Sequence, residues 1–139
     1  MIISMVPRER VPEIYELVRK MLQPAIDAAH GRMEWNSVLA ELGTGKTTLW
    51  AIAEDDGTIK AFAVFRIFDY PLVRALTVEL LGGKGFREHW GAEFVEVINS
   101  YAKEYNCGTI EAIGRKGWRR VLGDHGFKEI AVTFERPVE

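Results

Sequence analysis

The sequence contains little cysteine and no long apolar run, and each shortage excludes a class of protein. Its one cysteine, Cys107, allows neither an intrachain disulfide nor a cysteine-only zinc site. No run approaches the roughly 20 apolar residues that a membrane-spanning helix needs. The opening stretch MIISMVPRER reaches charged residues too early for a signal peptide. We therefore expect a soluble, cytoplasmic protein without a membrane partner.

The sequence also lacks an excess of charge and a pattern of metal ligands. With 18 Lys and Arg against 20 Asp and Glu, the net charge of −2 argues against a protein that coats nucleic acid. The histidines at 30, 89 and 125 have no metal-ligand spacing, so we expect no metal site. The basic run GRKGWRR (114–120) is typical of a solvated helix face with Trp118 turned into the core; its alternatives are contact with a ligand phosphate, a nucleic-acid backbone or an acidic partner.

What remains is an ordinary globular composition. The chain has 139 residues, of which 47% are hydrophobic and 27% charged, enough to bury the core of a single domain over residues 1–139. No repeat or interdomain linker divides it. The sequence is compatible with a homodimer but does not require one.

Hydrophobic periodicity predicts a mixed α/β chain in the order β-α-α-β-β-β-α-β-α-β. The three middle strands should pair antiparallel, with Asp55-Asp56-Gly57 as a hairpin turn, whereas the later strand–helix–strand passage requires parallel pairing. In the strand at 59–70, Phe62 and Phe65 differ in parity, so both of its faces should be covered, as in a central strand. Strands are expected at 2–6, 48–55, 59–70, 73–81, 108–113 and 127–138, and helices at 11–22, 33–42, 90–105 and 115–126.

The stretch AELGTGKTT (40–48) is similar to a nucleotide-binding loop, but two features exclude that function. The first glycine of such a loop is replaced by Ala40, and Glu41 adds a negative charge where phosphate would lie. The stretch also leaves a helix and enters a strand, the reverse of the phosphate-binding order. We expect Gly43 to cap the helix and Gly45 to allow a tight turn.

The stretch LLGGKGFREHW (80–90) has the opposite direction, because it leaves a strand and enters a helix. Free N–H groups and the helix dipole at such a junction can hold an anion, particularly a pyrophosphate. A glycine turn without a ligand is the alternative, since any strand-to-helix connection can use glycine.

Taken together, the element order, the opening MIISMVPRERVPEIYELV, the strand–GGKG–helix unit and the late GWRRVLGDHGFKEI resemble the GNAT acyltransferase superfamily. The resemblance covers nearly the whole chain. It implies a single GNAT-like α+β domain. It also implies an N-acyltransferase that uses acetyl-CoA as co-substrate and acylates an amine, on a small molecule or a protein, that the sequence does not identify.

In that family the pyrophosphate of acetyl-CoA lies on a loop of pattern Arg/Gln-x-x-Gly-x-Gly/Ala. Here the loop has Gly82 where Arg or Gln is expected and Arg87 where a small residue is expected. Arg87 could fill the phosphate space, or it could swing outward with Lys84 and bind phosphate through charge-assisted hydrogen bonds. The matching positions are Gly82, Gly83, Lys84, Gly85, Phe86 and Arg87.

The catalytic residues that the resemblance implies are few. Glu79 is the candidate base, acting directly or through a water molecule; a strand carboxylate facing outward is the alternative. The family's tyrosine acid falls at Leu122, four residues before Gly126-Phe127, so that acid is missing. Cys107 has no histidine partner nearby and is interpreted as a buried residue.

The missing acid and the altered loop suggest a second function. Small GNAT-shaped proteins with eroded loops resemble some found in bacteriophage genomes, including virion components. A catalytically inactive binding or structural protein is therefore the alternative to an enzyme.

Overall fold

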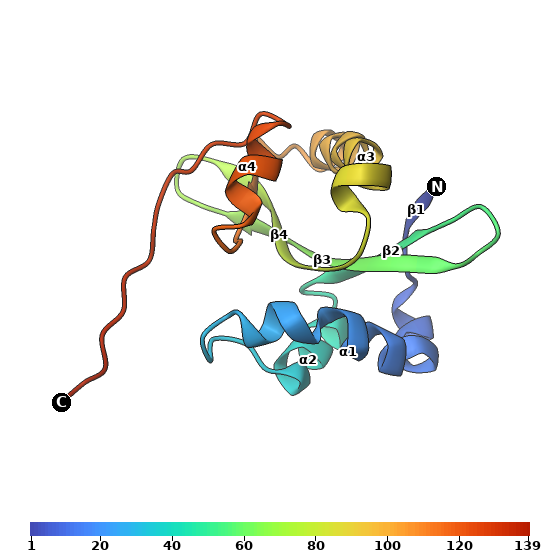
Figure 1. Cartoon of the computed structure of the whole chain (residues 1–139), viewed down its shortest axis with the longest axis horizontal. Helices are drawn as coiled ribbons and strands as arrows, with labels where there is room; N and C mark the ends of the chain where they lie inside the picture. The colour runs from blue at the N-terminus through green and yellow to red at the C-terminus, as the bar shows by residue number, and fades with distance from the viewer.

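The computed structural model describes residues 1–139 as a five-stranded sheet with helices on both faces (Figure 1). The strand order is β1-β2-β3-β4-β5, antiparallel throughout except for the parallel pair β4 and β5. The strands are β1 (Ile2–Met5), β2 (Thr48–Ala53), β3 (Ile59–Asp69), β4 (Arg74–Gly83) and β5 (Thr109–Ala112). The helical elements are η1 (Arg8–Arg10), α1 (Val11–Asp27), α2 (Trp35–Thr44), η2 (Phe86–Trp90), α3 (Gly91–Glu104) and α4 (Trp118–Gly123).

The sheet separates two hydrophobic clusters. Helices α1 and α2 cover one face, and α3 and α4 cover the other (Figure 1). Phe62 packs in the cluster under α1 and α2, while Phe65 packs in the cluster under α3, so the central position predicted for β3 is confirmed. Both rings are fully buried, and each contributes about 1.5–3 kcal/mol by leaving water.

Helix α1 follows the predicted apolar stripe and extends beyond it. Its buried residues Val18, Leu22 and Ile26 recur every fourth position, and Pro12 lies in the permissive first turn. The predicted end at Leu22 is too early because Ile26 continues the stripe past Pro24. No helix of the chain is long and apolar enough to cross a membrane.

Helix α2 ends later than the sequence predicted, and its cap is a different glycine. Gly43 lies inside the last turn of the helix, whereas Gly45 adopts a left-handed conformation (φ +80°) at the C-cap. The N–H of Gly45 donates to the carbonyl of Leu42 at 3.3 Å, which satisfies one of the carbonyls left free at a helix end. The assignment of the cap to Gly43 was therefore wrong.

The hairpins were predicted correctly, but the closing strand was not. Asp55-Asp56-Gly57 joins β2 to β3, with Gly57 at φ +92°. Residues 127–138, predicted to form the last strand, form no strand. Their apolar alternation matches a strand, but their backbone has no neighbouring strand to bond. We call residues 127–139 the C-terminal tail.

Candidate functional site

The two parallel strands, at one edge of the sheet, diverge partway along β4. The pairing of β4 with β5 runs from Ala75 opposite Thr109 to Val78 opposite Ala112 and stops there. Strand β4 continues to Gly83 with only β3 beside it. The divergence leaves one side of β4 without a strand neighbour, beside the carboxyl end of β5; α/β proteins bind ligands beyond the carboxyl ends of their parallel strands.

A bulge lies at the point of divergence. Phe65 of β3 is opposite Val78, while Val64 is opposite Leu80, so Glu79 is the extra residue in β4. A bulge bends its strand and changes the direction of a side chain, and it is common beside active sites. Glu79, the base predicted from the sequence, therefore stands at the one irregular position of β4, with its side chain 16% exposed.

The glycines that end β4 have structural reasons of their own. A Cβ at Gly82 would overlap the main-chain carbonyl of Met21 in α1, and a Cβ at Gly83 would overlap that of Lys60 in β3. Gly83 and Gly85 also have positive φ angles of +132° and +93°. Gly82 and Gly83 are thus accounted for by the close approach of α1 and β3 to β4.

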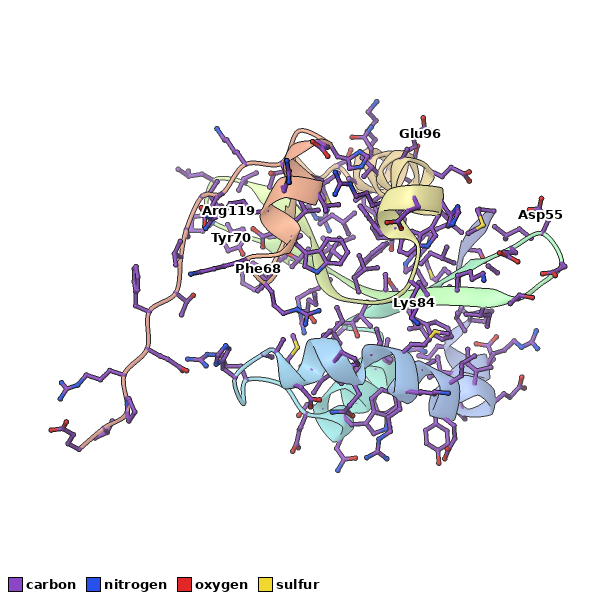
Figure 2. All side chains as sticks on the ribbon, in the orientation of Figure 1. Asp55, Phe68, Tyr70, Lys84, Glu96 and Arg119 are labelled. Carbon is purple, nitrogen blue, oxygen red and sulfur yellow. The ribbon has the colours of Figure 1, made fainter.

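Beyond these glycines the chain turns directly into a helix. Gly85 precedes η2, a π-helical turn that runs into α3, and the N–H groups of Trp90 and His89 both donate to its carbonyl at 3.2 and 2.8 Å. The N–H of Gly85 donates to no backbone carbonyl. The N–H groups of the first helical turn have no partner within the helix and carry its partial positive charge. Lys84 lies exposed where the chain leaves the sheet (Figure 2).

The side chains after Gly85 point in opposite directions. Arg87 is exposed, so it does not fill the space between the strands. Phe86 is only 7% exposed and packs edge-on against Trp90 and Trp118, with centroid separations of 5.1 Å in both cases. The direction of Arg87, which the sequence left open, is therefore outward, and it is Phe86 that enters the space between the layers.

Phe86 leaves a small pocket between the diverging strands. The pocket has a volume of about 50 Å³, against the 300–1,000 Å³ usual for ligand sites. Glu79 lies on its wall, and Leu122 occupies the position where the family's tyrosine acid was expected. Its other walls come from β4, β5, α3, α4 and the start of the C-terminal tail, in particular Val78, Phe94, Ala112, Trp118 and Phe127.

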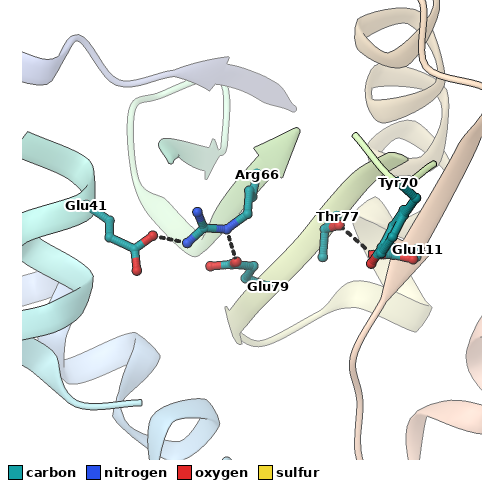
Figure 3. Close-up of polar contacts among 6 residues, drawn as sticks. All are labelled: Glu41, Arg66, Tyr70, Thr77, Glu79 and Glu111. Carbon is teal, nitrogen blue, oxygen red and sulfur yellow. Dashed lines mark hydrogen bonds and ion pairs between the residues drawn. The ribbon is translucent and has the colours of Figure 1, made fainter. Parts of the chain in front are cut away.

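Glu79 belongs to a three-residue ion-pair network on the sheet face that carries α1 and α2. The Nε of Arg66 in β3 donates to Glu79, and a terminal nitrogen of the same guanidinium donates to Glu41 in α2 (Figure 3). All three side chains are half-buried. Because one cation joins two carboxylates, the network retains one negative charge, and Arg66 fixes the orientation of Glu79.

A second polar cluster lies on β5 and the β3–β4 hairpin. Glu111 accepts hydrogen bonds from the hydroxyls of Tyr70 (2.6 Å) and Thr77 (2.8 Å) on the same carboxylate oxygen (Figure 3). The bond to Glu111 raises the pKa of the Tyr70 phenol above its usual value, so this phenol is a weaker proton donor than a free tyrosine.

Sequence reasoning proposed Glu79 and the glycine loop as site residues and did not propose Arg66, Glu41, Tyr70 or Glu111. One signal was present: Arg66 is a charged residue within the otherwise apolar run of β3, and the short hairpin brings that run close to Glu79. Glu41 comes from α2, distant in sequence, and no local pattern connects it with Arg66.

The remaining candidate residues from the sequence have no catalytic or metal-binding arrangement in the structure. Cys107 is half-buried, and burial raises the pKa of its thiol, the opposite of what a nucleophile needs. No group of three His, Cys, Asp or Glu side chains is placed to hold a metal ion. Trp118 is partly buried against Phe86, as its expected packing role requires.

Comparisons of the sequence with family models and with curated proteins found no match. Solved structures do match. A tetramutant of the BH1408 protein from Bacillus halodurans aligns with a TM-score of 0.74 at 18% identity, over 99% of this chain and 100% of that one. A predicted acetyltransferase from Clostridium acetobutylicum, crystallised with acetyl-CoA, aligns with a TM-score of 0.70 at 15% identity, over 98% and 95%.

A GNAT family acetyltransferase from Staphylococcus aureus also aligns, with a TM-score of 0.65 at 11% identity, over 99% of this chain and 98% of that one. The chain therefore has the GNAT acetyltransferase fold, as its resemblance predicted, in a divergent form. At these identities the likeness defines the fold and leaves activity to the residues of the site.

Proposed function

We propose that this protein is an N-acyltransferase that binds acetyl-CoA where β4 and β5 diverge and transfers the acetyl group to an amine. The observation that carries the proposal is the end of β4–β5 pairing at Val78 and Ala112, with Glu79 bulged out immediately beyond it. The Clostridium acetobutylicum neighbour, which has the same fold, was crystallised with acetyl-CoA. Acetyl-CoA chemistry would place the protein in the cytoplasm.

The loop after β4 offers the groups that a pyrophosphate requires. The free N–H groups at Gly85 and in the first turn of η2 point away from the helix at its positive end. Lys84 and Arg87 are both exposed beside them and can add charge-assisted hydrogen bonds. Because Arg87 points outward, it does not block the approach of phosphate to the backbone.

In the chemical step the amine nitrogen attacks the thioester carbonyl, the C–N bond forms and the C–S bond breaks. Glu79 accepts the proton that the amine gives up, directly or through a water molecule. Only one of its carboxylate oxygens bonds Arg66, which leaves the other for this proton. With Leu122 in place of an acid, the thiolate leaves without a tyrosine to protonate it and takes its proton from solvent.

Binding is tested by isothermal titration with acetyl-CoA. We expect saturable heat from the native chain and none from Gly85→Asp, since a carboxylate there repels phosphate. The matched control is Gly57→Asp: Gly57 has the same positive φ, +92° against +93°, but lies at the tip of the β2–β3 hairpin. Absence of heat from the native chain at millimolar ligand would remove the binding proposal.

The role of Glu79 is tested separately by the rate of acetyl transfer. Glu79→Gln should lower kcat by at least about tenfold without changing the affinity for acetyl-CoA. Glu41→Gln removes the other carboxylate bound to Arg66 and serves as the control, with at most a small loss. Equal rates for the native chain and Glu79→Gln would show that Glu79 is not the base.

A non-catalytic protein of the same fold is the second candidate, and one observation favours it. Phe86 is one of the apolar side chains that line the pocket between the strands, whose volume is about 50 Å³. Acetyl-CoA is larger than this pocket, so its acetyl end can enter only if the lining side chains move. A native chain that is folded, does not bind acetyl-CoA and co-purifies with a macromolecule would support this function, including the virion role of small phage proteins of similar shape.

A further inference from the structure

The C-terminal tail is an unpaired segment with the sequence pattern of a strand. Ile130, Val132 and Phe134 alternate with Ala131 and Thr133, as in a strand with one buried face. The three apolar side chains are instead 78%, 55% and 90% exposed. The backbone of residues 128–139 makes no hydrogen bond with any other backbone group. Figure 1 shows the tail running away from α4 with no strand beside it.

The sheet has an unpaired edge close to the start of this tail. Strand β5 is the last strand of the sheet and bonds only β4, so its outer N–H and C=O groups have no strand partner. Ile113, the residue that follows β5, is 76% exposed. An edge strand of this kind is a template for another extended segment. The chain thus contains a strand-like tail that pairs with no strand, and an edge strand, β5, whose outer side is unpaired.

Within one chain, ion pairs at both ends of the tail keep it away from its own β5. Near its start Glu129 pairs with Arg119 of α4 at 2.9 Å. Near its end Glu135 pairs with Arg32 at 2.9 Å and with His30 at 3.3 Å, both in the connection between α1 and α2. The hydrogen bond from Arg32 also lowers the pKa of Glu135. The tail therefore passes from the α4 layer to the α1–α2 layer across the plane of the sheet instead of running along β5.

We propose that the tail adds as an antiparallel strand to β5 of a second copy of this chain, and that the exchange is reciprocal. A register with Phe134 opposite Ile110 and Val132 opposite Ala112 places the exposed apolar row of the tail on one face. On β5, the side chains of Ile110 and Ala112 pack toward the α3 cluster, so the tail extends that cluster.

The same register is complementary in charge. Glu129 lies opposite Arg115, which forms no ion pair within its own chain, and the neutral Thr133 lies opposite Glu111. Ala131 then lies opposite Ile113 and covers it. Beyond this pair Lys128 would lie opposite Lys116, so we place the end of the pairing at Glu129 and Arg115. A one-residue shift would turn Val132 and Phe134 to the opposite face, so the apolar pattern selects this alignment.

A second copy is the occupant that fits because each copy offers one strand and one edge. Two copies related by a two-fold axis satisfy both and leave no further strand to recruit. The exchange also affects the pocket described above, since Phe127 begins the tail and Ile113 lies on the pocket wall. The tail of the second copy would close that wall beyond β5.

Sedimentation analysis of the full chain tests the dimer. We expect a native dimer and, for Phe134→Asp, a dissociation constant raised by at least about tenfold. The matched control is Val138→Asp, which removes a side chain that is 99% exposed but lies beyond the paired residues; it should remain a dimer. A native chain that is monomeric at about 100 µM, far above the dissociation constants of stable dimers, overturns the proposal.

Disulfide cross-linking distinguishes exchange from folding back on the same chain. In a Cys107→Ser background, Ile113→Cys and Ala131→Cys are made in separate chains and mixed under mild oxidation. Exchange predicts a covalent dimer only when both variants are present. If the doubly substituted chain instead forms an internal disulfide as a monomer, the tail pairs with its own β5, and the second-copy proposal is wrong.

Discussion

The chain contains two glycine-rich connections that look alike in sequence: residues 43–47, from the last turn of α2 to the start of β2, and residues 82–87, from the end of β4 into η2. The first follows the C-terminal end of a helix, where free carbonyl oxygens and the negative end of the dipole would repel phosphate. The second precedes the N-terminal end of a helix, where free N–H groups attract it. Which end of a helix adjoins the connection, more than its residue composition, therefore determines whether the connection can bind an anion.

The glycines of the two connections also differ in what surrounds them. Nothing lies within 4 Å of a Cβ placed at Gly43, whereas a Cβ at Gly82 would overlap the backbone of α1. Gly45 and Gly85 are alike, each with a left-handed conformation at a helix end. The comparison therefore separates glycines required by packing, glycines required by backbone conformation, and a glycine required by neither.

The largest effect is expected for Gly82→Ala. Its new methyl group meets the main-chain carbonyl of Met21, which cannot rotate away as a side chain could, so α1 must shift from β4. Such overpacking costs about 3 kcal/mol of unfolding free energy. Urea unfolding followed by circular dichroism measures it. A loss below about 0.5 kcal/mol would mean that α1 does not approach β4 this closely.

The second largest effect is the shift in melting temperature caused by acetyl-CoA, compared with that caused by ATP. Acetyl-CoA at about 100 times its dissociation constant should stabilise the protein by about 2.7 kcal/mol, a rise in Tm of roughly 10 °C for a domain of this size. ATP with Mg²⁺ should leave Tm unchanged, because the connection at 43–47 has the wrong polarity. A shift with ATP that disappears in Lys46→Ala would reverse the comparison.

The sequence predicts most of this fold because most of its elements carry their own periodicity. The β2–β3 hairpin follows from alternation around Asp55-Asp56-Gly57, and the two-sided burial of β3 follows from the parity of Phe62 and Phe65. The tail carries the same kind of alternation, yet it forms no strand in a single chain. Local pattern defines a strand's preference, and a neighbour with free backbone groups decides whether it forms.

The candidate site is less predictable than the fold. The connection at 82–87 could be located because glycines stand between a strand pattern and a helix pattern. The inward direction of Phe86 could not, since it depends on Trp90 and Trp118, the second of which lies on another helix. The contact of Glu41 with Arg66 likewise depends on how α2 lies against the sheet. Tertiary packing determines such features, and no short stretch of sequence records it.

A smaller effect is expected for Gly45→Ala. The residue must keep φ near +80°, which costs a residue with a Cβ about 1 kcal/mol. The new methyl group meets only a terminal nitrogen of Arg8, the mobile end of a side chain, so packing adds little. Thermal unfolding should show a Tm lower by a few degrees. A loss as large as that of Gly82→Ala would indicate that the first connection is also closely packed.

The smallest effect is expected for Gly43→Ala, which should raise the free energy of unfolding instead of lowering it. Its sign shows whether Gly43 or Gly45 caps α2. Gly43 lies in the last turn of α2 with open space around it, so Gly43→Ala adds a better helix former without a clash. The unfolded chain also loses freedom, and together these effects should stabilise the protein by about 0.5–1 kcal/mol. If Gly43 were the cap, as its sequence suggests, the same substitution would destabilise the protein by a similar amount. Urea unfolding of this variant, with Gly45→Ala as its reference, therefore determines by sign alone which glycine ends the helix and where the connection begins.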